Sequence, residues 1–144
     1  MSLDANKALI RRFYREIDAG NLDALDELVD ENYLDHSPPP FPGLGAPGRA
    51  GLKQAFALFW EATPGRHAIE DQIAEGDKVV TRLHCTGTHS GDLPGIPATG
   101  HALEMTATVV HRIADGRIVE KWSDKDVLSL LQQLGVLPPP AERA

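Results

Sequence analysis

The chain has 144 residues, of which 42% are apolar, and 21 Asp and Glu against 14 Lys and Arg give a formal net charge of -7. Such an acidic chain repels phosphate backbones, so we expect no nucleic-acid partner. No apolar run reaches the roughly 18 residues of a membrane span, and the N-terminus lacks a signal-peptide pattern. We therefore expect one cytoplasmic domain over residues 1–144, with no membrane partner.

Sequence motifs for common catalytic and metal sites are missing. Cys85 is the only cysteine, so the chain forms no internal disulfide and no thiolate cluster. No GxSxG elbow, phosphate-binding glycine loop, HExxH or CxxC motif occurs. The six histidines form no HxH or HxxxH pair. We predict no metal and no cofactor, although a metal held by residues far apart in sequence stays open.

The first half of the chain predicts three helices. Apolar residues at helical spacing predict the first over residues 6–20, and Asn21 is placed to cap a second over 22–29. Residues 37–51 contain five prolines and four glycines, which predicts a loop and a possible mobile lid. Helical spacing then returns over 51–62.

The second half of the chain changes to β-branched runs separated by turn residues. A short amphipathic helix is predicted over residues 126–134, and we expect the tail after residue 138 to be frayed. Helices followed by antiparallel strands predict an α+β fold. The predicted strands cover residues 67–74, 78–88, 102–113 and 117–125.

A two-residue turn at Asp115-Gly116 sets the predicted register of the last hairpin, with His111 opposite Glu120. The more apolar face of this hairpin is expected to face the core. Glu120 is then either the ion-pair partner of His111 or a pocket group. This face comprises Leu103, Met105, Ala107, Val109, His111, Ile113, Ile118, Glu120, Trp122 and Asp124.

Two residues are candidates for acid/base chemistry. His36 follows the predicted second helix and precedes the loop, a position at a pocket mouth that suits a general base, or a loop histidine that only binds backbone. Asp126 begins the last helix, where an N-cap role competes with a chemical one. Several side chains can line a pocket for a flat ligand or simply form core. They are Tyr14, Tyr33, Phe59, Trp60, Met105, Val109, His111 and Trp122.

Three motifs together carry a family resemblance. The runs RRFYREIDAGNLDALDELVDENYLDHSPP, GTHSGDLPGIPATG and RIADGRIVEKWSDKDVLSLLQQLG resemble the SnoaL-like polyketide (ester) cyclases of the nuclear transport factor 2-like superfamily. The resemblance covers nearly the whole chain. It implies a cone-shaped half-barrel, in which a curved antiparallel or mixed sheet packs against three N-terminal helices and a short C-terminal helix closes the domain. It also implies a homodimer and a largely apolar cavity.

The resemblance further implies an activity, because type members of this family close a ring by an intramolecular aldol reaction without metal or cofactor. Their acid/base Asp lies four residues after a strand Trp, which matches Asp126 after Trp122. We expect Asp126 to act with His36 on a small, flat, hydrophobic carbonyl compound. In the predicted register, His111 lies roughly 20 Å from Asp126 and is left as pocket lining. Two alternatives are a non-catalytic binding protein and an epoxide hydrolase of the same superfamily.

Overall fold

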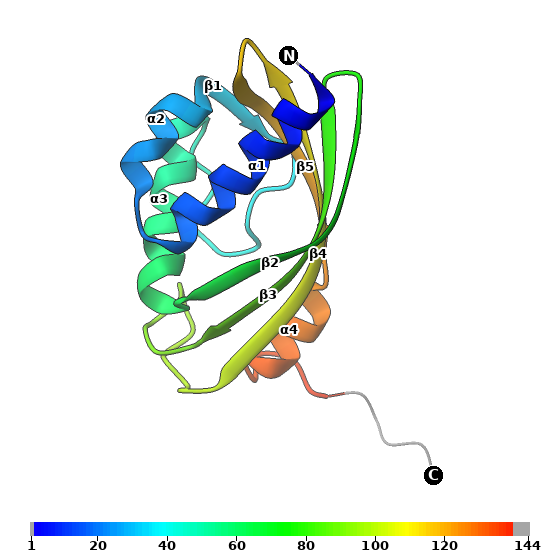
Figure 1. The fold of residues 1–144 in the computed structure, drawn as a ribbon. Helices are drawn as coiled ribbons and strands as arrows, with labels where there is room; N and C mark the ends of the chain where they lie inside the picture. The colour runs from blue at the N-terminus through cyan, green and yellow to red at the C-terminus, as the bar shows by residue number, and fades with distance from the viewer. Residues whose placement is uncertain (1, 140–144) are drawn as a thin grey trace.

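Five strands form one mixed sheet in the order β1-β5-β4-β3-β2 in the computed structural model, which describes residues 2–139 (Figure 1). β1 pairs with β5 in parallel, and the other neighbours are antiparallel. This arrangement confirms the predicted α+β class. The strands are β1 (Val29–Asp35), β2 (Gly65–Glu75), β3 (Lys78–Thr88), β4 (Ala102–Ala114) and β5 (Arg117–Lys125).

The helices α1 (Leu3–Asp18) and α3 (Gly48–Ala62) cover one face of this sheet (Figure 1). α1 packs on β2, α3 packs on β1, and the short α4 (Val127–Gln133) contacts β4. In the described residues, no helix is long and apolar enough to cross a membrane. The predicted first and third helices are confirmed, although they begin three residues earlier than expected. Fraying of residues 140–144 lies outside the described part of the chain.

The predicted second helix is wrong in length and in its cap. The segment forms a 3₁₀ turn over Leu22–Ala24 and a single helical turn, α2, over Leu25–Leu28. Asn21 makes no capping hydrogen bond, and its side-chain NH₂ donates to Oε2 of Glu16 at 2.7 Å. The chain therefore leaves the helical conformation before residue 29.

The strand β1 is absent from the sequence-based prediction. Val29, assigned there to the second helix, begins this strand, and Val29 and Tyr33 are buried. Its hydrogen-bonding partner is β5, which lies more than 80 residues later in the chain. A strand whose partner is so distant leaves little local signal, because pairing and burial decide its conformation.

A β-bulge in the β4–β5 hairpin overturns the predicted register. Ala114 lies opposite Arg117, as predicted, but Arg112 pairs with Glu120, and Val119 is the extra residue of the bulge. His111 therefore faces Lys121 and not Glu120. Because side chains alternate along a strand, one extra residue reverses the faces of everything beyond it. The inner face of β5 then carries Lys121, Ser123 and Lys125, whereas Glu120, Trp122 and Asp124 are on the outer face.

The hydrophobic core lies between α1 and the inner face of the sheet. Ile10 of α1, Val79 of β3 and Ile118 of β5 are completely buried there. A second apolar cluster includes Phe41 and Leu44 of the loop after β1, together with Leu134 beyond α4. The predicted loop thus begins after β1, ends at α3 and packs its apolar side chains into the domain. The wall of the site is built between these two clusters.

Candidate active site

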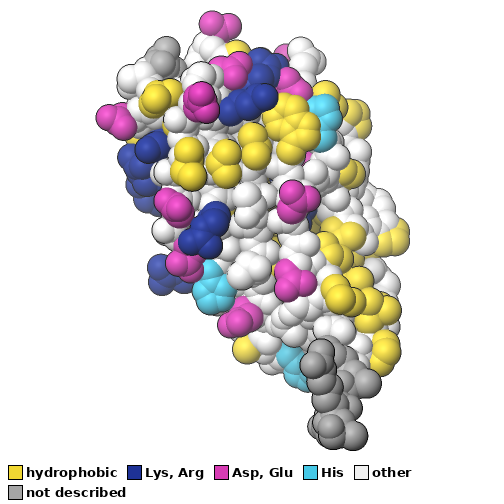
Figure 2. Space-filling model, turned by 90° about the vertical axis from the view of Figure 1, so that its right-hand side faces the viewer, with side chains coloured by type: hydrophobic (Ala, Val, Ile, Leu, Met, Phe, Trp, Pro, Cys, Tyr) yellow, Lys and Arg dark blue, Asp and Glu magenta, His cyan; other side chains and the backbone are white. Residues whose placement is uncertain are grey.

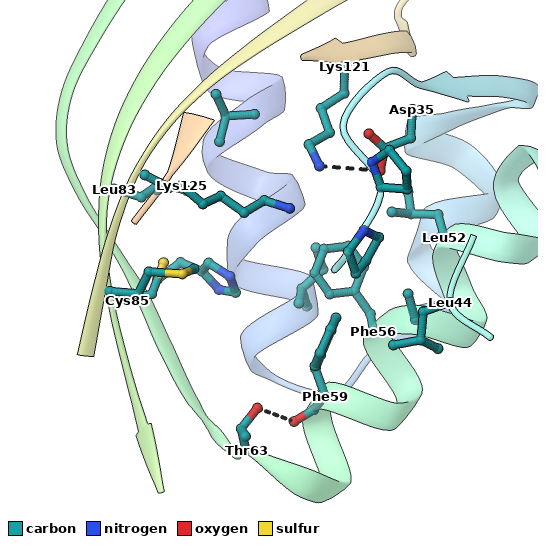
Figure 3. A pocket seen from close by; sticks show the side chains of 18 of the residues that line it. Asp35, Leu44, Leu52, Phe56, Phe59, Thr63, Leu83, Cys85, Lys121 and Lys125 are labelled. Carbon is teal, nitrogen blue, oxygen red and sulfur yellow. Dashed lines mark hydrogen bonds and ion pairs between the residues drawn. The ribbon is translucent and has the colours of Figure 1, made fainter. Parts of the chain in front are cut away.

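A cavity of about 390 Å³ lies between the inner face of the sheet and the helices α1 and α3 (Figure 3). Its wall is mostly apolar, and residues of the proline-rich loop from 38 to 47 form part of it. Cavities of about this size bind small organic ligands. The apolar part of the wall includes Phe13, Leu44, Leu52, Phe56, Phe59 and Leu103.

Seven of the eight residues predicted to bind a substrate do line this cavity, and their part in binding stays a prediction. They are Tyr14, Tyr33, Phe59, Trp60, Met105, Val109 and His111. Trp122 is the exception, because the bulge places it on the outer face. The two predicted acid/base residues, His36 and Asp126, do not line the cavity either.

His36 belongs to a cluster on the outer face of the sheet. Its Nε2 lies 2.8 Å from Oε2 of Glu120, and its ring stacks on Trp122 with 4.7 Å between centroids. Glu120 also accepts hydrogen bonds from Arg112, and the bonds from His36 and Arg112 lower its pKa. Figure 2 views the molecule from this side and shows acidic and basic side chains interspersed on its surface. The expectation that His36 reaches the cavity is therefore wrong.

Asp126 caps the N-terminus of α4. Its Oδ1 accepts a hydrogen bond from the backbone N–H of Ser129 at 3.1 Å, and the residue is exposed. Its own N–H donates to the carbonyl of Thr106. This geometry matches the capping role that competes with a chemical one in the sequence. The expectation that Asp126 reaches the cavity is wrong, and its role as an acid/base group stays a prediction.

A carboxylate–imidazole pair lies on the cavity wall, where α1 ends and β2 begins. Nδ1 of His67 is 2.6 Å from Oδ1 of Asp18, and the backbone N–H of His67 donates to Oδ2 at 2.8 Å. Both residues line the cavity. A carboxylate at Nδ1 holds the proton of a neutral imidazole there, so Nε2 has a free lone pair. This pair has the arrangement of a general base.

Sequence reasoning missed Asp18 and His67 because 49 positions separate them and no local motif joins them. One signal existed in the sequence. Asp18 lies in the last turn of the predicted first helix, where the helix dipole disfavours a carboxylate. A carboxylate at such a position indicates a partner elsewhere in the fold.

His111 is a second histidine on the cavity wall, and it is only 1% exposed. Burial, with a smaller contribution from Lys121, lowers its pKa to about 3, so its imidazole is neutral. Its ring packs against the rings of Phe13 and Tyr14, whose centroids are 5.5 and 6.1 Å away. Among the described residues, Nδ1 of His111 has no hydrogen-bond partner. An unpaired buried nitrogen costs about 1–3 kcal/mol.

Three more cavity residues keep their protons at neutral pH. Burial raises the pKa of Tyr14 and Tyr33 far above the ordinary value, so both phenols are neutral hydrogen-bond donors. The Cys85 thiol has a pKa raised to about 11 by burial and by Asp18, against a smaller opposing effect of Lys125. The thiol is therefore not a nucleophile at neutral pH.

Two lysines of β5 complete the site, and the bulge is the reason that they face inward (Figure 3). Nζ of Lys121 lies 3.3 Å from Oδ2 of Asp35 and 3.3 Å from the carbonyl oxygen of Ser37. Nζ of Lys125 donates to the same carbonyl at 3.5 Å. Burial, followed by the charge of Lys121, lowers the pKa of Lys125 to about 8. Sequence reasoning missed both lysines because it predicted a regular hairpin.

Residues 2–139 contain no group of three or more His, Cys, Asp and Glu side chains placed to hold a metal ion. The chemistry that the described side chains themselves support is proton transfer in an apolar cavity. His67 supplies a base, the two phenols supply donors, and the lysines supply positive charge.

The chain is similar to known proteins over nearly its whole length. A family model described as SnoaL-like polyketide cyclase matches residues 8–134. The aklanonic acid methyl ester cyclase DnrD of Streptomyces peucetius is 32% identical over 134 residues, which cover 88% of each chain. DauD of Streptomyces sp. strain C5, also named an aklanonic acid methyl ester cyclase, is 31% identical and covers 88% of this chain and 80% of its own.

A solved structure shows the same fold. TsrD of Streptomyces laurentii superposes with a TM-score of 0.83 at 26% identity, and the match covers 95% of this chain and 99% of TsrD. The chain therefore has the nuclear transport factor 2-like fold.

Proposed function

The chain belongs to the SnoaL-like polyketide cyclase family, and from this premise we propose that it closes a ring in a flat polyketide ester. The reaction is an intramolecular aldol addition without a cofactor, and the small hydrophobic substrate lies in the cavity. The substrate class is taken from the relatives, which are named for the methyl ester of aklanonic acid. This ester is the first compound to test.

The single observation that carries the proposal is the Asp18–His67 pair on the cavity wall. Nε2 of His67 removes a proton from a carbon beside a carbonyl, and the resulting enolate attacks a second carbonyl of the same molecule. A carbon–carbon bond forms, the second carbonyl becomes an alkoxide, and the alkoxide takes the proton back. Asp18 stabilises the imidazolium that forms between these steps.

The rest of the cavity supports this chemistry. The apolar wall folds a flexible substrate around its reacting carbons and excludes water, and such positioning accelerates reactions within one molecule. The hydroxyls of Tyr14 and Tyr33 offer hydrogen bonds to substrate oxygens. An epoxide hydrolase is less well supported, because Asp18 and Asp35 of the cavity are bound to His67 and Lys121 and not to an arginine.

The test is turnover of aklanonic acid methyl ester by the purified protein, followed by chromatography of the cyclised product. We expect His67→Gln to lower kcat by about 100-fold or more, a typical contribution of a general base. Asp18→Asn should have a similar effect, because it no longer fixes the tautomer of His67. His84→Gln is the matched control, since His84 does not line the cavity.

Asp126→Asn, measured in the same assay, tests the assignment made from the sequence. We expect this variant to keep its activity, because Asn also caps helices well. Loss of turnover in Asp126→Asn, with full turnover in His67→Gln, would return the acid/base role to Asp126. An ester that binds to wild type and is never consumed would instead favour the non-catalytic binding protein.

A further inference from the structure

Lys125 is a cavity lysine with no acidic partner. Within residues 2–139, no carboxylate lies within ion-pair distance of its Nζ, whereas Lys121 on the same strand is paired with Asp35. In the same part of the chain, the one oxygen that accepts a hydrogen bond from the Lys125 amine is the carbonyl of Ser37, at 3.5 Å. The cavity therefore contains an amine that, among the described residues, has no carboxylate in ion-pair contact.

The surroundings of Lys125 make a positive charge on this amine costly. Three ionisable groups face it: Lys121 on its own strand, Asp35 at the end of β1, and Cys85 on β3. Lys121 repels it, Asp35 attracts it but is in an ion pair with Lys121, and the Cys85 thiol is protonated. Burial of an unpaired charge is unfavourable, and an anion placed beside the amine removes that cost.

The sheet register places Lys125 across the cavity from the base. Lys125 pairs with Ala107, which pairs with Leu83 of β3. Cys85, two residues along β3, pairs with His67 of β2. β2 and β5 are three strand spacings apart, which is about 14 Å between backbones. Both side chains project into the same cavity, so a flat ligand lying across the sheet meets His67 on one side and Lys125 on the other.

We propose that Lys125 binds the ionised oxygen of the ligand, as the cationic counterpart of the His67 base. This inference rests on the proposed function, and it narrows the ligand class to flat conjugated compounds with an enol or phenol oxygen that can lose its proton. The Lys125 ammonium stabilises the negative charge that spreads onto such an oxygen when His67 removes a proton. Electrostatic stabilisation of this kind is strong in a cavity without water.

The probe for this test is 7-hydroxycoumarin, a flat phenol that ionises near neutral pH and whose phenolate has its own absorption band. We expect binding to wild type to increase the phenolate band, which means that the pKa of the bound phenol falls. Lys125→Met should reduce phenolate affinity by about tenfold or more, equivalent to one unit of phenol pKa. Lys125→Arg, which keeps the charge, should retain most of the effect.

Two controls separate charge from shape. 7-Methoxycoumarin is neutral at all pH values, so Lys125→Met should leave its affinity unchanged. Lys78→Met removes a lysine that lies outside the cavity over the Trp122 ring, and it should leave the affinity for both coumarins unchanged. If Lys125→Met lowers the affinity for both coumarins equally, the proposal is overturned, because the effect is then one of packing and not of charge.

The proposal is also overturned if Lys125→Met binds the phenolate as tightly as wild type does. A third contrary outcome is that Lys125 forms an imine with a ketone ligand. Borohydride would reduce this imine and leave the mass of the reduced ligand on Lys125, which mass spectrometry detects. These are binding measurements, so they do not depend on whether the protein catalyses ring closure. A protein that binds the phenolate through Lys125 and closes no ring would refute the proposed function and leave the anion site in place.

Discussion

The cavity combines ionisable side chains whose protonation differs strongly at one pH. His111 and the two phenols are neutral because of burial, while the Asp18 carboxyl group lies 2.6 Å from Nδ1 of His67. Lys125, with a pKa lowered to about 8, remains mostly protonated at pH 7. One small apolar cavity thus contains an imidazole, neutral hydrogen-bond donors and a cation, and the surroundings of each group determine its protonation state.

Neutral burial of His111 makes stability depend on pH. Its pKa is about 3 in the folded protein, against the ordinary histidine value of 6.5 in the unfolded chain, so the unfolded chain binds more protons between these values. The contribution of His111 to the free energy of unfolding is therefore fully present above about pH 6.5, and it is lost as the pH falls toward 3. The midpoint of urea unfolding of the wild type should therefore move to a lower urea concentration when the pH is lowered from 7 to 4. The midpoint of His111→Phe should move less. Equal shifts would contradict the neutral burial of His111.

A single side-chain cap begins the short helix α4. α4 has only seven residues, and the one side-chain bond at its N-terminus comes from Asp126. Asp126→Ala should lower the free energy of unfolding by about 1 kcal/mol, and Asp126→Asn by clearly less, because Asn is an equivalent cap. Chemical denaturation of the three proteins measures the difference. If Ala and Asn are equally harmful, the carboxylate has a role beyond capping.

The elements differ in how well the sequence predicts them. α1, α3 and the four strands β2 to β5 have periodic patterns or a tight turn within their own segments, so their positions are predicted to within a few residues. β1 depends on β5, and the second helix ends where that pairing begins. The Asp115-Gly116 turn was predicted correctly, with positive φ at both residues, but the bulge at Val119 has no local signal.

The same limits decide how much of the site is predictable. Apolar lining residues such as Phe59 and Met105 follow from spacing on helices and strands, and they do line the cavity. The polar groups do not follow from spacing, because Asp18 meets His67 only through tertiary packing and Lys125 faces inward only through the bulge. The sequence therefore predicts the fold and the apolar wall of the cavity, whereas the positions of its polar side chains depend on tertiary structure.

At the scale of the whole molecule, the cavity is a region of the core that is left unfilled. Ala107 is a small residue on the inner face of β4, between Leu83 and Lys125. Ala107→Phe should fill part of the cavity, leave the melting temperature equal or higher, and weaken binding of 7-methoxycoumarin by at least about tenfold. Ala102→Phe is the control, because Ala102 is exposed and does not line the cavity. Unchanged affinity in Ala107→Phe would place the ligand elsewhere.

The bulge gives β5 two possible working faces within one stretch of sequence. With the extra residue at Val119, Lys121 and Lys125 face the cavity. With a regular hairpin, an acidic and aromatic face with Glu120, Trp122 and Asp124 would take their place. A descendant of this chain can thus exchange the β5 side chains that face the cavity by losing the extra residue of the bulge, while Asp18 and His67 stay in place. A new reaction in this scaffold can therefore begin with a change of alignment between two strands.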